Sequence, residues 1–198
     1  MRKPFDEAKM CQAAYAYEQS TTWHTQHPNL EHAERRTYVI RVSHRGENYN
    51  MLGVFAHVGI TVSDMERAVH FYRDLLGLKV VGDVTFGGEE ADVLTQEKGT
   101  KLRAVYLRSV DEAKGAPIEL LHFLSPVAEG KPYPGIKNPG ITEVAFWVKD
   151  IEKTYSDLTA QGVQFYSRPQ LFELESYKVK AVYFRDPDGT TLELLQRV

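Results

Sequence analysis

Cysteine is nearly absent from this chain: Cys11 is the only one among 198 residues. A single thiol excludes an intramolecular disulfide and any zinc site built from several thiolates. If the chain binds a metal, the ligands must therefore come from His and carboxylate side chains.

The chain also lacks a long apolar run and a surplus of positive charge. No segment approaches the ~20 apolar residues of a membrane helix, and the N-terminus shows no secretory-signal pattern, so we expect a cytoplasmic protein with no membrane partner. The 24 Lys and Arg residues are outnumbered by 27 Asp and Glu. This balance provides no basic field for a phosphate backbone, so we expect no nucleic-acid partner. With a hydrophobic content of 42%, the chain can bury a core, and a small-molecule substrate becomes the default partner.

An internal repeat is the strongest feature that the sequence does contain. The segment HVGITVSDMERAVHFYRDLLGL begins at His57, and EVAFWVKDIEKTYSDLTAQGV begins at Glu143. Farther along, KLRAVYLR from Lys101 matches KVKAVYFR from Lys178, and IELL in the first half matches LELL in the second. Both halves therefore open and close in the same way, which indicates one structural unit used twice.

Hydrophobic periodicity assigns the elements of this unit. The alternation after His57 has the period of two of a half-buried strand. The following segment has the spacing of an amphipathic helix that starts at Ser63 or Asp64 and ends at Gly77. Extended segments are predicted at 80–86, 103–108 and 117–123 in the first half, and at 163–167, 180–185 and 191–196 in the second. The predicted fold is α+β, with two βαβββ modules in tandem.

The repeat also sets the predicted domain boundaries. Residues 1–50 stand outside it as an N-terminal extension, and Met51 is a candidate for the natural start of the protein. The remaining chain divides into module one (52–124), a linker (125–140) and module two (141–198). The linker is rich in Pro and Gly, and we expect it to connect the modules; it is also a candidate lid over the site.

Ionisable residues recur at equivalent positions of the first and last strand of each module. They are His57, Glu119, Glu143 and Glu193. Strand periodicity places each on the face opposite the helix, so a pseudo-twofold arrangement would direct all of them into one concave sheet. Three carboxylates gathered there would repel one another, and a divalent ion would compensate for that repulsion.

The opening HVGITVSDMERAVHFYRDLLGL and the closing YFRDPDGTTLELLQ resemble the two ends of glyoxalase-like proteins of the vicinal oxygen chelate superfamily. The resemblance covers roughly Leu52 to Val198. It implies a cupped sheet around a divalent metal, with His57, Glu119, Glu143 and Glu193 as its ligands. It also implies a homodimer, in which each site lies within one chain or between two.

Glu143 departs from the family pattern, because most relatives have His at this position. One imidazole with three carboxylates is a hard donor set that favours Mn²⁺, Mg²⁺, Fe²⁺ or Ni²⁺ over a Zn²⁺-preferring site. Alternatively, Glu143 stays off the metal and serves as a base, with the other three residues as ligands.

The resemblance implies a glyoxalase-like lyase or isomerase acting on a substrate with vicinal oxygens. The metal would bind two substrate oxygens while Glu193 or Glu119 moves a carbon-bound proton, as in lactoylglutathione lyases and acyl-CoA epimerases. An extradiol-type dioxygenase and a metal-free drug-binding protein, similar to bleomycin-resistance proteins, are the alternatives. Trp147 is expected to form a pocket wall, and the matching Tyr106 and Tyr183 to pack on the sheets.

Overall fold

The structure is a computed structural model that describes residues 52–109, 115–174 and 176–198. These residues belong to one compact unit, Asn50–Val198. The extension predicted for residues 1–50 lies outside the described residues. Within the described ranges, no helix is long and apolar enough to cross a membrane.

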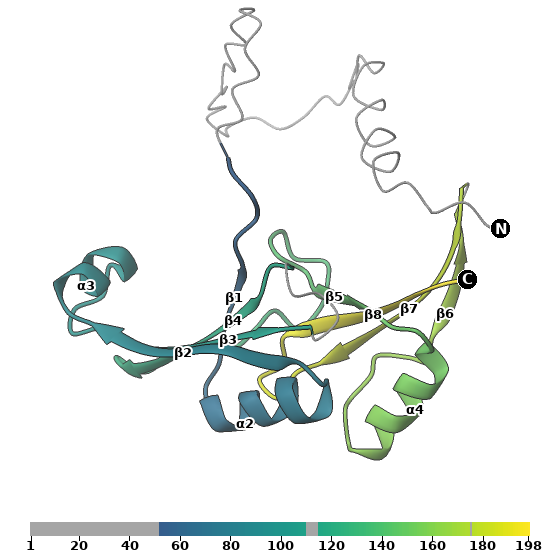
Figure 1. The fold of residues 1–198 in the computed structure, drawn as a ribbon, viewed down its shortest axis with the longest axis horizontal. Helices are drawn as coiled ribbons and strands as arrows, with labels where there is room; N and C mark the ends of the chain where they lie inside the picture. Colours follow the sequence, from purple (N-terminus) through teal and green to yellow (C-terminus); the bar gives the residue numbers. More distant parts are fainter. Residues whose placement is uncertain (1–51, 110–114, 175) are drawn as a thin grey trace, which may run out of the picture. The chain divides into compact units, whose positions relative to one another are not determined.

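Module one is a four-stranded sheet with a helix along one face (Figure 1). Its strands lie in the order β1-β4-β3-β2, with β1 parallel to β4 and the other neighbours antiparallel. Helix α2 continues directly into a π-helical segment, η2. The elements are β1 Val58–Thr61, α2 Met65–Val69, η2 His70–Leu75, β2 Lys79–Gly87, α3 Glu89–Thr95, β3 Lys101–Arg108 and β4 Ile118–Ser125.

Module two repeats this topology with one helix and four strands. The strand order is β5-β8-β7-β6, and β5 is parallel to β8. The elements are β5 Val144–Trp147, α4 Ile151–Ala160, β6 Gln170–Glu173, β7 Lys178–Arg185 and β8 Thr191–Arg197. The prediction of two βαβββ modules is therefore confirmed.

One local prediction is wrong, and one helix lies where the sequence predicts no element. The segment 163–167 forms no strand, and the outer strand β6 begins only at Gln170. Phe165 makes an isolated bridge with Phe184, and its ring packs between those of Tyr155 and Phe184. Pro169 then follows, which has no backbone N–H to donate to a strand ladder, so regular pairing starts beyond it. The second difference is helix α3, which lies between β2 and β3 where the sequence predicts no element.

Both module helices start at an aspartate. The Asp64 side chain accepts a hydrogen bond from the backbone N–H of Arg67, and the Asp150 side chain accepts one from Lys153, each at 3.0 Å. These contacts satisfy backbone donors that the first helical turn leaves free, and the negative charge favours the N-terminal end of the helix dipole. Of the two candidate caps for the first helix, Asp64 is thus the one used.

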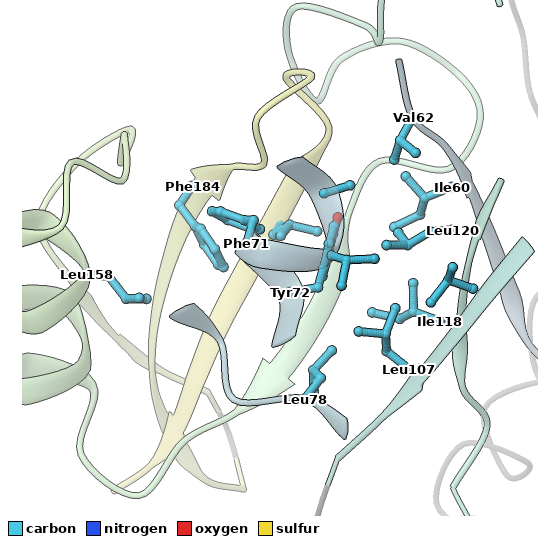
Figure 2. Close-up of a cluster of buried hydrophobic side chains, with 14 of the residues drawn as sticks. Ile60, Val62, Phe71, Tyr72, Leu78, Leu107, Ile118, Leu120, Leu158 and Phe184 are labelled. Atoms are coloured by element: carbon cyan, nitrogen blue, oxygen red, sulfur yellow. The ribbon is translucent and has the colours of Figure 1, made fainter. Parts of the chain in front are cut away.

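One buried hydrophobic cluster contains side chains from both modules (Figure 2). Tyr72 from η2 and Leu107 from β3 belong to it, as do Leu158 from α4 and Phe184 from β7. Tyr72, Leu107 and Phe184 are fully buried. Because apolar surface from both modules leaves water together, we expect the two modules to unfold as one unit.

The Asp-Pro-Asp-Gly sequence forms the tight turn that its composition predicts. The backbone N–H of Gly189 donates to the carbonyl of Asp186 at 3.0 Å, and Gly189 has a φ of +98°. The buried Asp186 carboxylate also accepts from the backbone N–H of Thr190 at 2.8 Å. The turn that joins β7 to β8 is therefore stabilised by hydrogen bonds to the buried Asp186.

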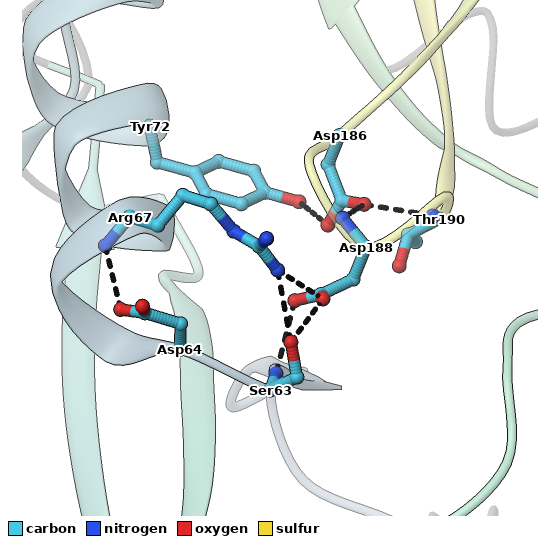
Figure 3. A network of polar contacts seen from close by, with 7 residues as sticks. All are labelled: Ser63, Asp64, Arg67, Tyr72, Asp186, Asp188 and Thr190. Atoms are coloured by element: carbon cyan, nitrogen blue, oxygen red, sulfur yellow. Dashed lines mark hydrogen bonds and ion pairs between the residues drawn. The ribbon is translucent and has the colours of Figure 1, made fainter.

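This turn also binds helix α2 of module one (Figure 3). The Asp188 carboxylate accepts hydrogen bonds from the hydroxyl and backbone N–H of Ser63, and it forms an ion pair with Arg67 at 2.6 Å. The Tyr72 hydroxyl donates to Asp186 at 3.0 Å. Polar contacts thus supplement the shared core in holding the modules together.

Candidate metal site

Strand alternation separates the candidate ligands from the core. On β4, Ile118 and Leu120 belong to the buried cluster, so Glu119 between them points to the opposite face. On β8, Leu192 and Leu194 flank Glu193 in the same way. The two glutamates therefore occupy equivalent positions on equivalent faces, as the repeat predicts.

In module one, Glu119 is paired with His57, which lies just before β1. The His57 Nε2 atom is 2.9 Å from Glu119 Oε2. The Glu119 side chain is only 9% exposed, whereas that of His57 is 42% exposed. The opposed residue on β1 is Gly59, where an added Cβ would lie 3.9 Å from Glu119 Oε2, an ordinary contact distance.

Tyr106 adds a third side chain to this pair. It lies directly opposite Glu119 across β3 and β4, and its hydroxyl donates a short hydrogen bond to Glu119 Oε1 at 2.5 Å. The hydrogen bond that Tyr106 donates to Glu119, together with burial, raises the pKa of Tyr106, so the phenol stays protonated at neutral pH. The sequence predicts Tyr106 only as a packing residue; its contact with Glu119 depends on strand register.

In module two, the equivalent residues are Glu143 and Glu193. Glu143 precedes β5, and Glu193 on β8 lies opposite Ala145 on β5 and Tyr183 on β7. Burial raises the pKa of Glu193, and the negative charge of Glu143 raises it further. Burial also raises the pKa of Tyr183, and the negative charges of Glu193 and Glu143 raise it further. Module two therefore holds two mutually repelling carboxylates where module one holds an imidazole and a carboxylate.

The structure arranges the four predicted ligands as two pairs, one on each module. Among the described residues, no group of three or more His, Cys, Asp or Glu side chains is arranged to hold a metal ion. Each pair does suit a divalent cation: an imidazole nitrogen and a carboxylate oxygen already face one another in module one, and a cation would relieve the repulsion in module two. The joining of both pairs around one ion remains a prediction.

A cavity of about 730 Å³ is lined by one of the four candidate ligands, Glu143, while His57, Glu119 and Glu193 are not among its lining residues. It is lined by β1, by Glu143 and by linker residues Ala128–Pro132. Two basic side chains line it as well: Arg67, which is paired with Asp188, and Lys131 from the linker. Glu143 is therefore at the wall of a space large enough for a small molecule.

Trp147 lies at the far end of β5 from Glu143 and is 53% exposed. The guanidinium of Arg197 lies over its ring, 4.7 Å from the centroid. Trp147 lines a different, smaller cavity of about 270 Å³ together with Leu76 and Leu78. Trp147 thus lines a cavity, as expected, but not the cavity that Glu143 lines.

Replacing Glu143 by Gln should lower the pKa of Glu193. The substitution removes one of the two causes of the raised value, while burial remains. Because the folded-state pKa of Glu193 is raised, its contribution to stability is present below the unfolded value near 4.5 and is lost as the pH rises through the folded pKa. The substitution should therefore narrow the pH range between the unfolded and the folded pKa of Glu193, over which this contribution to stability is lost. A side-chain ¹³C NMR titration of metal-free protein measures the change; an unaltered Glu193 pKa would mean that the two carboxylates are not neighbours.

Comparison with known proteins identifies the family of the chain. The family model described as "Glyoxalase/Bleomycin resistance protein/Dioxygenase superfamily" matches residues 54–194. The uncharacterised protein YraH of Bacillus subtilis (strain 168) is 26% identical over 138 residues, which are 69% of this chain and 93% of that protein. The uncharacterised protein YurT of the same organism is 29% identical over 139 residues, covering 70% of this chain and 94% of YurT.

Solved structures show the same fold. A glyoxalase family protein from Bacillus cereus has a TM-score of 0.66 at 24% identity, covering 77% of this chain and 99% of its own. A superfamily member from Sphaerobacter thermophilus DSM 20745 has a TM-score of 0.50 at 27% identity, covering 74% and 98%. The chain therefore belongs to the glyoxalase/bleomycin resistance protein/dioxygenase superfamily.

Proposed function

We propose that this protein is a metal-dependent lyase or isomerase of the glyoxalase type, which transfers a proton on a small substrate with vicinal oxygens. One observation carries the proposal. Each module presents an ionisable pair, His57 with Glu119 and Glu143 with Glu193, at equivalent strand positions and away from the core. A purely structural sheet has no need of a partly buried ionisable pair at the same place in both modules.

In this proposal, His57, Glu119, Glu143 and Glu193 hold one divalent ion, with Mn²⁺, Mg²⁺, Ni²⁺, Fe²⁺ and Zn²⁺ as candidates. When bound, such an ion supplies Lewis acidity toward two substrate oxygens. The donor set of one nitrogen and carboxylate oxygens favours the harder ions.

Glu193 is the candidate base. Its pKa is raised by burial and by Glu143, and a carboxylate with a raised pKa is a better proton acceptor at neutral pH. Glu119 is the repeat-equivalent alternative, but it is already engaged by His57 and Tyr106. Glu143 fits either of two roles, as a ligand or as a second base at the wall of the cavity.

The activity test uses metal-reconstituted protein with two probes. One is the hemithioacetal of glutathione and methylglyoxal, followed by thioester formation; the other is an α-branched acyl-CoA, followed by deuterium uptake from D₂O. We expect turnover or exchange with one probe class, and a loss of about 10²- to 10⁴-fold in Glu193→Gln. Failure of both probes with protein that binds metal would contradict the lyase or isomerase assignment.

Glu143→His separates the two roles of Glu143. If Glu143 is a ligand, His should preserve binding and shift the preference toward Zn²⁺ or Ni²⁺, because imidazole suits these ions better than a third carboxylate. If it is a base, metal preference should stay unchanged while proton exchange is lost. Glu143→Gln serves as the comparison, and no change in either quantity would remove Glu143 from the site.

In this proposal, the two pairs that hold one ion come either from the two chains of a homodimer or from the two modules of one chain. Mixing Glu119→Gln with Glu193→Gln protein distinguishes these assemblies after subunit exchange. If sites form between chains, each heterodimer regains one intact site, and about a quarter of wild-type activity should return. If each site lies within one chain, the mixture should stay inactive.

The absence of a three-donor group among the described residues favours a second function, metal-free binding of a small molecule. In that case the cavity of about 730 Å³ would be the binding site. Protein that binds none of the five ions after reconstitution would support this function over the first.

A further inference from the structure

We infer that Tyr106 is a positioning residue that holds Glu119 for metal binding through a single carboxylate oxygen. The inference rests on the proposed function, because it concerns the geometry of one of the proposed ligands. The two oxygens of Glu119 have different partners. Oε1 accepts the hydrogen bond from Tyr106, while Oε2 faces His57 Nε2 at 2.9 Å.

The Tyr106 ring is held on several sides. It lies against Gly82 on the neighbouring strand β2, where an added Cβ would come within 3.2 Å of Tyr106 Cδ2. The His57 ring meets it edge-on, with 6.1 Å between centroids and an interplanar angle of 79°. Since the missing side chain at position 82 provides the space for the ring, the hydroxyl is directed at Glu119 by packing as well as by hydrogen bonding.

This arrangement commits Oε1 of Glu119 to Tyr106 and leaves Oε2, which faces His57 Nε2, as the oxygen that a cation bound beside His57 would meet. A carboxylate with one oxygen held by a hydrogen bond cannot readily turn to chelate through both oxygens, so Oε2 and His57 Nε2 remain as adjacent donors. Hydrogen-bonded partners of ligating groups commonly fix ligand orientation in this manner. Module one is therefore the preorganised half of the proposed site.

Module two lacks the equivalent contact and so offers a matched control. Tyr183 occupies the repeat-equivalent position opposite Glu193, and its ring lies 6.1 Å from that of Tyr166. Within the described residues, its hydroxyl makes no hydrogen bond to either carboxylate of the module. Removing the Tyr183 hydroxyl should thus affect ligand orientation far less than removing that of Tyr106.

The test compares Tyr106→Phe and Tyr183→Phe by calorimetric titration of Mn²⁺ into metal-free protein. We expect Tyr106→Phe to weaken binding about 10- to 100-fold, and Tyr183→Phe to weaken it by no more than a few-fold. The visible spectrum of Co²⁺-loaded protein gives a second readout, because its intensity depends on the number of donor atoms. Tyr106→Phe should change this spectrum as Glu119 gains freedom to chelate, and loss of packing alone would not.

Unchanged affinity and an unchanged Co²⁺ spectrum in Tyr106→Phe would overturn the inference while leaving the metal site standing. Equal losses in both Tyr variants would overturn it as well, since the effect would then not depend on the Glu119 contact. A wild-type protein that binds neither Mn²⁺ nor Co²⁺ would overturn the proposed function and this inference together, and that result is obtained before any variant is compared.

Discussion

Replacing Glu119 or Glu193 by Gln should weaken binding of a divalent ion by more than the ~10- to 100-fold typical of losing an outer contact, because each change removes a charged ligand itself. The two glutamates come from different modules, so a comparable loss of affinity in each variant would show that both modules contribute ligands to one ion. Calorimetric titration with Mn²⁺ measures both variants.

Glu152→Gln provides the control for this pair of substitutions. Glu152 pairs with Lys180 between α4 and β7, and its side chain is 58% exposed. An exposed ion pair of this kind contributes little, so both metal affinity and stability should stay near those of the wild type. A large loss in Glu119→Gln beside unaltered binding in Glu193→Gln would restrict the site to module one.

Phe184→Ala should destabilise the protein by about 3–5 kcal/mol, the usual range for truncating a buried phenylalanine. Phe184 is fully buried on β7, and its ring stacks on Phe165 with 5.3 Å between centroids. It belongs to the same cluster as Phe71 and Tyr72 of module one (Figure 2). The resulting cavity would therefore weaken packing within module two and between the modules. Urea unfolding of metal-free protein measures the change.

Phe172→Ala is the matched control for this substitution. Phe172 lies on the outer strand β6 and is 49% exposed, so its truncation should change stability by about 0.5 kcal/mol or less. Two separate unfolding transitions in the wild type, only one of them shifted by Phe184→Ala, would contradict the view that the two modules share one cooperative core.

The repeat made most of this fold predictable from sequence. Strand alternation assigns Glu119 and Glu193 to the face opposite their buried Ile and Leu neighbours, and the structure places them there. Asp64 and Asp150, aligned by the repeat, both start helices. These features depend on local periodicity and capping, which a sequence records directly.

The features that escaped prediction depend on tertiary packing or on pairing register. Phe165 looks like a strand residue, but its ring packs between those of Tyr155 and Phe184, and β6 forms farther along. The contact of Tyr106 with Glu119 follows from the β3–β4 register, which is not fixed by composition. Likewise, the repeat identifies two ionisable pairs but does not determine how closely they approach each other.

The central claim is that one divalent ion is held jointly by the pair from module one and the pair from module two. Native mass spectrometry of Mn²⁺-reconstituted protein, with metal content checked by elemental analysis, tests it most directly. We expect close to one ion per chain, lost in Glu119→Gln and equally in Glu193→Gln. Two ions per chain, each removed by only one of these substitutions, or no ion at all, would contradict it.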